Sequence, residues 1–476
     1  MLHLWNIANN HTWRISNVTA SAMAIFAILL VVYAASIDIR ATRGASITGD
    51  EPFYLLTTQS LIEDRNLDLT RQYELHSYES FFDHPDGLWM QSSVRENGKL
   101  LSPHNPGLSI LIIPGFVIGG LIGVQIQMMI IAALTFSLSY ILLVKIIGRF
   151  WISWFTTIGV AITATAIIYS TEIYPEFPAA LSLIIALLII QKTNQTTIWQ
   201  ATGLLLCLTA MVWFGVKYAP LAGLVAVWGF WRMDSPVRAV FLVFTILTAS
   251  LYCWFHLETF GGLTPYSVNL VYSGDGTISI LGSHLDFTQR LYRPLGLFLD
   301  ERFGIARWAP ILLFVLPAVP LLWKINGLPR LVLALIVVQI FIATFVVITM
   351  MGWWFPGRTL VTVLPLMGLP LAILLMQSPI WVRFFLGLFG AYSLVITAFL
   401  AVSGHTREIV IAVDPFDMSS PIFRSISPIV PDYRIWDVHT WTLTLIWVAV
   451  IGLLTFAFYF AEIFNQSNQP AEIAEN

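Results

Sequence analysis

The chain has 476 residues, of which 57% are hydrophobic and only 11% are charged. A soluble domain carries closer to a quarter charged residues, so this composition excludes an ordinary soluble protein and predicts a polytopic membrane protein. The formal net charge of −3 gives no reason to expect binding to nucleic acid.

The first apolar run, residues 20–37, follows a polar stretch and lacks a small-residue cleavage site, so it predicts a retained anchor. Cys207 and Cys253 lie inside later apolar runs and are expected to be small, buried and unpaired. The later runs cover 122–144, 150–170, 177–191, 198–214, 218–231, 238–256, 308–323, 331–350, 359–376, 384–402 and 440–461. They predict one all-α domain over residues 1–476 with about 12 transmembrane helices, in a range of roughly 11–13.

One more run, 107–120, is short and is interrupted by Pro114 and Gly115. We expect an interfacial or re-entrant helix here, because a broken helix tolerates membrane depth only where protein surrounds it. If 107–120 spanned the membrane instead, every later connection would change sides.

The distribution of basic residues predicts which connections lie on the cytoplasmic side of the membrane. With 107–120 not spanning, the connections on one side contain Asp234 as their single acid and a group of cations. These cations are Lys145, Arg149, Lys192, Arg232, Arg238, Lys324, Arg330 and Arg383. The positive-inside rule then predicts that both termini are cytoplasmic, which suits a bacterial plasma membrane.

Three long connections, 38–106, 257–307 and 403–439, fall on the outer side, and the polar tail 463–476 is expected to be disordered in the cytoplasm. The first of these connections should contain a helix that lies along the membrane surface. Its apolar face would consist of Tyr54, Leu55, Thr58, Leu61 and Ile62.

Asp50, Glu51 and Pro52 open this helix. Proline favours the first helical turn, and an acid before it can simply cap free backbone N–H groups. Ionised groups beside a bilayer cost free energy, and a protein usually retains them only where they have a function. The acid pair is therefore also a candidate catalytic centre. A carboxylate there could take a proton from an acceptor hydroxyl.

Two other outer segments carry candidate site residues. Glu172 and Glu176 lie in a connection that contains no basic residue; they are either solvated turn residues or a second acidic wall of the site. Two carboxylates could hold a divalent cation or divide proton transfer and orientation between them. His104 precedes the broken helix and could bind phosphate, ligate a metal or cap the helix.

Four cations on the outer side run against the inward basic bias: Lys217, Arg302, Arg307 and Arg358. Each alone could extend to lipid headgroups. Together they suit an anionic ligand such as the phosphate or diphosphate of a lipid carrier.

With these motifs the chain resembles the GT-C superfamily of integral-membrane glycosyltransferases, especially its protein O-mannosyltransferase and lipid A aminoarabinose transferase branch. Asp50–Glu51 is similar to the acid pair that this family places after its first span. His104–Pro106 resembles the family's His-Pro or Lys-Pro element, and Glu172–Glu176 resembles its second acidic loop. The segments 296–310 and 352–358 look like elements of bacterial relatives. Many members have Asp where the second acidic loop here offers Glu.

The resemblance implies a polyprenyl-phosphate-linked sugar as donor and a hydroxyl of a lipid, glycan or protein as acceptor. Asp50 would be the base, and Glu51 would orient the acceptor or hold a metal. Arg358, Arg302 and Lys217 would stabilise the leaving phosphate, and inversion at the anomeric carbon is expected. Glu172 or Glu176 would support the site from the opposite wall. The main alternative is a transporter or flippase of lipid-linked envelope precursors, which would place its ionisable groups near the bilayer midplane. A non-catalytic assembly protein for envelope polysaccharide is a further alternative.

Overall fold

A computed structural model describes residues 15–95, 97–191, 197–269, 287–347 and 349–467. Within these residues the chain is an all-α membrane protein in which extended structure is limited to isolated β-bridges. Seven helices are long and apolar enough to cross a membrane. They span Asn17–Ser36, Ile113–Ile147, Ser235–Val268, Leu328–Val346, Arg358–Gln377, Ile380–His405 and Val438–Phe460.

Five shorter apolar helices account for the other predicted spans. They cover Phe150–Ala161, Glu176–Gln191, Ile198–Phe214, Val216–Phe230 and Pro310–Lys324. Each predicted apolar run therefore overlaps a helix within the described residues, although a count of twelve spans is not established by helix length. Proline and polar breaks explain the shortness of two of them: the run 150–170 is interrupted at Ile162 and Thr163, and 310–324 alternates between 3₁₀ and α turns.

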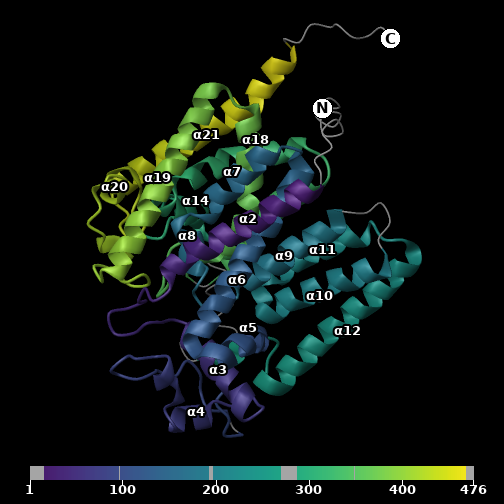
Figure 1. The fold of residues 1–476 in the computed structure, drawn as a ribbon, viewed down its shortest axis with the longest axis vertical. Helices are drawn as coiled ribbons and strands as arrows, with labels where there is room; N and C mark the ends of the chain where they lie inside the picture. Colours follow the sequence, from purple (N-terminus) through teal and green to yellow (C-terminus); the bar gives the residue numbers. More distant parts are fainter. Residues whose placement is uncertain (1–14, 96, 192–196, 270–286, 348, 468–476) are drawn as a thin grey trace.

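Helices α9–α12 form one group, and α18, α19 and α21 form another (Figure 1). Helix α6 packs against α2, α7 and α9 and so links the first part of the chain to the first group. The helices named here are α2 (Ile15–Tyr33), α6 (Ile113–Ile147), α7 (Phe150–Ala161), α9 (Glu176–Gln191), α10 (Ile198–Phe214), α11 (Ala219–Phe230), α12 (Ser235–Phe260), α18 (Gly368–Gln377), α19 (Ile380–His405) and α21 (Val438–Ser467).

The remaining helices are α3 (Glu51–Glu63), α4 (Thr70–Glu74), α5 (Pro106–Leu111), α8 (Ala164–Tyr169), α14 (Arg293–Leu299), α15 (Ile305–Trp308), α16 (Val315–Ala318), α17 (Leu328–Phe341) and α20 (Pro421–Arg424). Of these, α3, α4 and α5 lie together at the end of the molecule opposite the start of α2 and the end of α21 (Figure 1). The predicted first outer connection is thus one folded cap.

The broken run 107–120 forms part of a helical hairpin. Gly119 and Gly120 leave the helical conformation, and Gly120 has φ +55°, where glycine is favoured. The chain reverses there, so that the carbonyl of Gly115 would lie 2.1 Å from a Cβ added to Gly123. Gln127 closes the hairpin by accepting the Gly115 N–H and donating to the Leu111 carbonyl.

Three expectations need correction. The helix α3 does not have a single apolar face: residues on all its sides are buried from Glu51 to Thr58, because α5 and α6 pack against it. Cys207 and Cys253 are unpaired as expected, but Cys253 is exposed on α12, whose outward face is apolar. The C-terminal helix α21 continues through Ser467, while the rest of the predicted tail, 468–476, lies outside the described residues.

Candidate functional site

The carboxylate of Asp50 does not cap the helix that follows it. Asp50 occupies the N-cap position of α3, and Pro52 lies in the first turn as predicted, yet no backbone N–H of the helix donates to the Asp50 side chain. The carboxylate instead accepts a hydrogen bond from Nη2 of Arg358 at 2.6 Å. The simple capping interpretation of this acid is therefore wrong.

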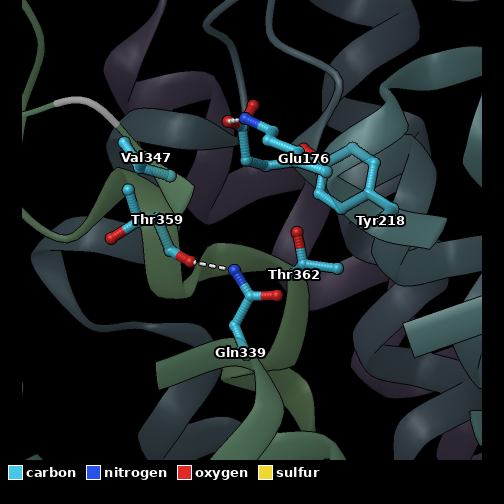
Figure 2. A pocket seen from close by; sticks show the side chains of 7 residues that line it. Glu176, Tyr218, Gln339, Val347, Thr359 and Thr362 are labelled. Atoms are coloured by element: carbon cyan, nitrogen blue, oxygen red, sulfur yellow. Dashed lines mark hydrogen bonds and ion pairs between the residues drawn. The ribbon is translucent and has the colours of Figure 1, made fainter. Parts of the chain in front are cut away.

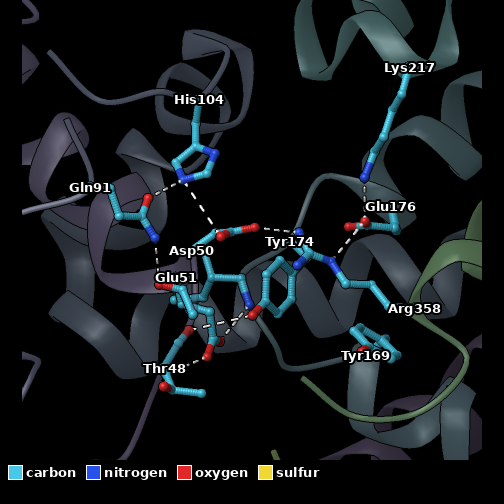
Figure 3. A network of polar contacts seen from close by, with 12 residues as sticks. Thr48, Asp50, Glu51, Gln91, His104, Tyr169, Tyr174, Glu176, Lys217 and Arg358 are labelled. Atoms are coloured by element: carbon cyan, nitrogen blue, oxygen red, sulfur yellow. Dashed lines mark hydrogen bonds and ion pairs between the residues drawn. The ribbon is translucent and has the colours of Figure 1, made fainter. Parts of the chain in front are cut away.

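Arg358 connects Asp50 to the second acidic segment (Figure 3). Its Nε donates to Oε1 of Glu176 at 3.1 Å, and Nζ of Lys217 donates to the same oxygen at 2.8 Å. Four of the predicted site residues thus form one chain of alternating charge, from Asp50 through Arg358 and Glu176 to Lys217. We call it the charge chain.

Exposure differs along the charge chain. The side chains of Asp50 and Lys217 are 24% and 29% exposed, whereas those of Arg358 and Glu176 are 9% and 2% exposed. A buried Arg–Glu pair therefore separates an accessible carboxylate from an accessible ammonium group. The two ends of the charge chain are thus partly exposed, whereas its inner pair is shielded from solvent.

Aromatic rings hold the Arg358 guanidinium in place. Its central carbon lies 3.8 Å from the centre of the Tyr174 ring and 5.2 Å from that of Trp354. Such cation–π contacts add to the ion pairs and fix the plane of the guanidinium. Gly49 lies against the same tyrosine at φ +61°, where an added Cβ would be 2.7 Å from the Tyr174 hydroxyl.

Arg358 also determines the charge of Asp50. Burial by itself raises the pKa of Asp50, but Arg358, with help from His104 and Lys217, outweighs burial and lowers the pKa to about 2. Asp50 is therefore ionised at any physiological pH in this conformation.

His104 is part of the same site. Its Nε2 lies 3.7 Å from Oδ1 of Asp50 and 2.8 Å from Oε1 of Gln91. The ring packs on Tyr54 with centroids 4.9 Å apart. Burial lowers the pKa of His104, so the imidazole is mostly neutral at pH 7 and can donate a hydrogen bond from Nε2.

Glu51 lies beside Asp50 but points into the protein. Its two carboxylate oxygens accept the backbone N–H groups of Thr48 and Ile173, each at 3.0 Å. Burial raises the pKa of Glu51 to about 7, against the effect of these hydrogen bonds. Through these hydrogen bonds Glu51 ties the start of α3 to the segment before α9.

Glu172 is buried next to this point and belongs with Glu51 rather than with the charge chain. Its Oε2 has no hydrogen-bond partner within the described part of the chain. Burial, followed by the charge of Glu51, raises the pKa of Glu172 well above its usual range. A carboxyl group in such surroundings keeps its proton.

Arg302 and Arg307 make their contacts elsewhere. Arg302 lies over the ring of Phe416, with 4.2 Å between the guanidinium carbon and the ring centre. Arg307 lies over Phe423 at 4.1 Å and donates to Ser427. These contacts join the 296–310 segment to the 403–439 connection and do not involve the members of the charge chain.

A narrow crevice opens beside Glu176 and Lys217 (Figure 2). Its empty volume is about 170 Å³, and in this conformation it is too narrow to hold a water molecule. Oε2 of Glu176 and Oε1 of Gln339 both border it without a hydrogen-bond partner among the described residues. The other lining residues are Tyr218, Val347, Thr359 and Thr362.

Within the described residues, no three His, Cys, Asp or Glu side chains are grouped closely enough to hold a metal ion. The structure therefore provides no ready ligand set for the divalent cation that the paired acids suggested. The charges of Asp50 and Glu176 are balanced instead by Arg358 and Lys217.

Sequence reasoning missed Gln91 and Tyr174. Gln91 has no sequence signal, because an isolated glutamine in a long connection is ordinary. Tyr174 stands between Glu172 and Glu176, so its proximity to the site could have been inferred.

Comparison with protein-family models, with curated proteins and with solved structures gave no match.

Proposed function

We propose that this protein is an integral-membrane glycosyltransferase of the GT-C type. It transfers a sugar from a polyprenyl-phosphate carrier to a hydroxyl group of a lipid, glycan or protein, with inversion at the anomeric carbon. In this proposal the twelve apolar helical segments all span a bacterial plasma membrane, both termini are cytoplasmic, and the site faces outward.

The charge chain is the observation that carries this proposal. Group transfer to a hydroxyl needs a carboxylate that can take a proton and cations that can stabilise a leaving phosphate. Asp50 supplies the first, and Lys217 and Arg358 supply the second, from segments far apart in the sequence. The motif resemblance described above supports the same assignment.

In the proposed reaction the acceptor oxygen attacks the anomeric carbon while Asp50 takes the hydroxyl proton. The bond between that carbon and the phosphate oxygen breaks, and its electron pair leaves with the phosphate. Lys217 faces the developing charge from the accessible end of the charge chain, and Arg358 faces it from within. His104 donates a hydrogen bond that orients the Asp50 carboxylate or the acceptor.

The test uses purified full-length protein in lipid nanodiscs with a panel of polyprenyl-phosphate sugars carrying a labelled sugar. Wild-type protein should release polyprenyl phosphate and label a hydroxyl acceptor supplied as membrane extract. Asp50→Asn should lower the rate by roughly 10²- to 10⁴-fold. Asp83→Asn is the matched control, because Asp83 is also ion-paired at 2.7 Å, with Arg40, but lies outside the charge chain.

A transporter or flippase would give a different result. In proteoliposomes it would move the labelled lipid between leaflets and leave the sugar–phosphate bond intact. Translocation without bond cleavage would reject the transferase assignment in favour of that alternative.

A further inference from the structure

We propose that Arg358 exchanges its ion-pair partner during the reaction, from the Asp50 carboxylate to the phosphate of the polyprenyl carrier. This inference rests on the proposed function, and it adds a role in the reaction for the ion pair between Asp50 and Arg358.

The first step of the argument concerns the cations. Arg358 and Lys217 both donate to a single oxygen of Glu176, whose other oxygen has no hydrogen-bond partner among the described residues. Glu176 therefore accepts one hydrogen bond from Arg358 and one from Lys217. The strongest further contact of Arg358 is with Asp50, at 2.6 Å.

The second step concerns charge. With Asp50 and Glu176 ionised, the charge chain carries two negative and two positive charges and is neutral. A phosphodiester that arrives with one negative charge adds an excess anion to a poorly hydrated site. Asp50 and the phosphate then compete for the same guanidinium, because a planar fork of donors suits either anion.

The third step concerns the proton. When Asp50 takes the acceptor proton it becomes neutral, and the phosphate gains one negative charge as the sugar leaves. Total charge is conserved, but one negative charge moves from one neighbour of Arg358 to the other. A guanidinium held between Tyr174 and Trp354 can follow that charge by a small shift in its hydrogen bonds.

The exchange explains why a carboxylate paired so tightly can still act as a base. While Arg358 is bound to it, Asp50 is weakly basic and the site is idle. Arrival of the phosphate weakens the pair and makes the carboxylate more basic. The base is thus activated only when donor is present, which limits loss of the donor to water.

The experiment measures binding of polyprenyl monophosphate to full-length protein in detergent micelles, with polyprenol as the ligand that lacks phosphate. Asp50→Asn removes the competitor, so it should bind polyprenyl phosphate about tenfold more tightly than wild type, although it is inactive in transfer. Asp83→Asn should bind as wild type does, and polyprenol should show no difference among the three proteins.

A double-mutant cycle separates partner exchange from a general loss of negative charge. In an Arg358→Gln background, Asp50→Asn should bring no gain in affinity. A gain of the same size in that background would overturn the exchange, as would equal or weaker binding by the Asp50→Asn variant alone.

An infrared measurement tests the exchange without the Arg358→Gln variant, so its result does not depend on whether that variant folds. Adding polyprenyl phosphate to wild-type protein should shift the carboxylate stretching band of Asp50. The same addition to Asp50→Asn should produce no such shift. An unchanged carboxylate band on binding would reject the exchange alone. If neither wild type nor Asp50→Asn binds polyprenyl phosphate, the proposed function itself fails.

Discussion

The side chains of Asp50 and Arg358 form an ion pair, with 2.6 Å between Oδ2 and Nη2, although 308 residues separate them in the chain. Asp50 precedes α3 in the cap at one end of the molecule. Arg358 begins a buried segment, Arg358–Met367, that packs against α9 and α17. The pair therefore joins the cap to the helical body at the site.

Arg358→Lys tests the importance of the guanidinium fork. A lysine ammonium can reach one carboxylate as a point charge, but it cannot satisfy Asp50 and Glu176 in the same planar arrangement. We expect the variant to fold and the KM for the polyprenyl-phosphate donor to rise about tenfold, with a smaller change in the KM for the acceptor. Steady-state kinetics with each substrate varied in turn measures both.

Arg40→Lys provides the comparison for this variant. Arg40 pairs with Asp83 in the same cap, so the same substitution there changes one surface ion pair and leaves the charge chain intact. Its kinetics should stay close to those of wild type. Equal KM changes for donor and acceptor in Arg358→Lys would remove Arg358 from donor binding.

Glu172→Gln tests the protonated state of the buried acid pair. Because burial raises the pKa of Glu172, the folded protein holds a proton that the unfolded chain releases at its usual, lower pKa. The folded state binds more protons in that window, so the stability contributed by this proton is present at low pH and is lost as pH rises. Glu51, with a pKa of about 7, contributes with the same sign.

The expected result is a difference that grows with pH. At about pH 5 wild type and Glu172→Gln should melt at similar temperatures, since a protonated carboxyl and an amide are alike in charge. At about pH 9 the variant should be the more stable, by on the order of 1 kcal/mol or more, because wild type must take up a proton at Glu172 or bury its charge when it folds. Thermal denaturation in detergent across this range checks the sign. A gap that stays constant with pH would mean that the pKa of Glu172 is the same in the folded and the unfolded protein.

The sequence predicted the members of the charge chain because each is an ionisable residue at the edge of an apolar run, where burial is costly. It did not predict their pairing, since Asp50, Glu176 and Arg358 meet only through packing of distant segments. It also could not separate Arg358 from Arg302, because both lie on predicted outer segments beside aromatic residues. The difference lies in their neighbours: Arg302 contacts Phe416 and Arg358 contacts two acids.

In the fold, too, local features could be predicted from the sequence and tertiary packing could not, as α3 and the broken run 107–120 show. The prediction that 107–120 would be interrupted is confirmed, but the breaks fall at Ile112 and at Gly119–Gly120, whereas Pro114 and Gly115 lie in the first turn of α6. The burial of α3 on all sides was not predicted, because its periodicity showed one apolar face and gave no sign of α5 and α6 on the others. Tertiary packing decides burial on those sides.

Gly123→Ala tests the helical hairpin. An added Cβ would lie 2.1 Å from the Gly115 carbonyl oxygen, a backbone atom that cannot rotate away. We expect a loss of about 1–3 kcal/mol in stability, measured as a lower melting temperature in detergent. Gly223→Ala is the matched control, because the space around Gly223 is open and alanine favours a helix. Equal melting temperatures for the two variants would mean that the hairpin is looser than the structure shows.

Single-cysteine labelling tests the proposed sidedness of the membrane protein. Cys207 and Cys253 are first replaced by alanine, and one cysteine is then introduced at Glu79 in the cap or at Asp234 before α12; both positions are exposed. If the cap faces outward, a membrane-impermeant maleimide should label Glu79→Cys in intact cells and label Asp234→Cys only after the membrane is opened. Both substitutions lie outside the charge chain, so transfer activity should persist and confirm folding. The reverse labelling pattern would place Asp50 and Arg358 on the cytoplasmic side and would contradict an outward-facing site.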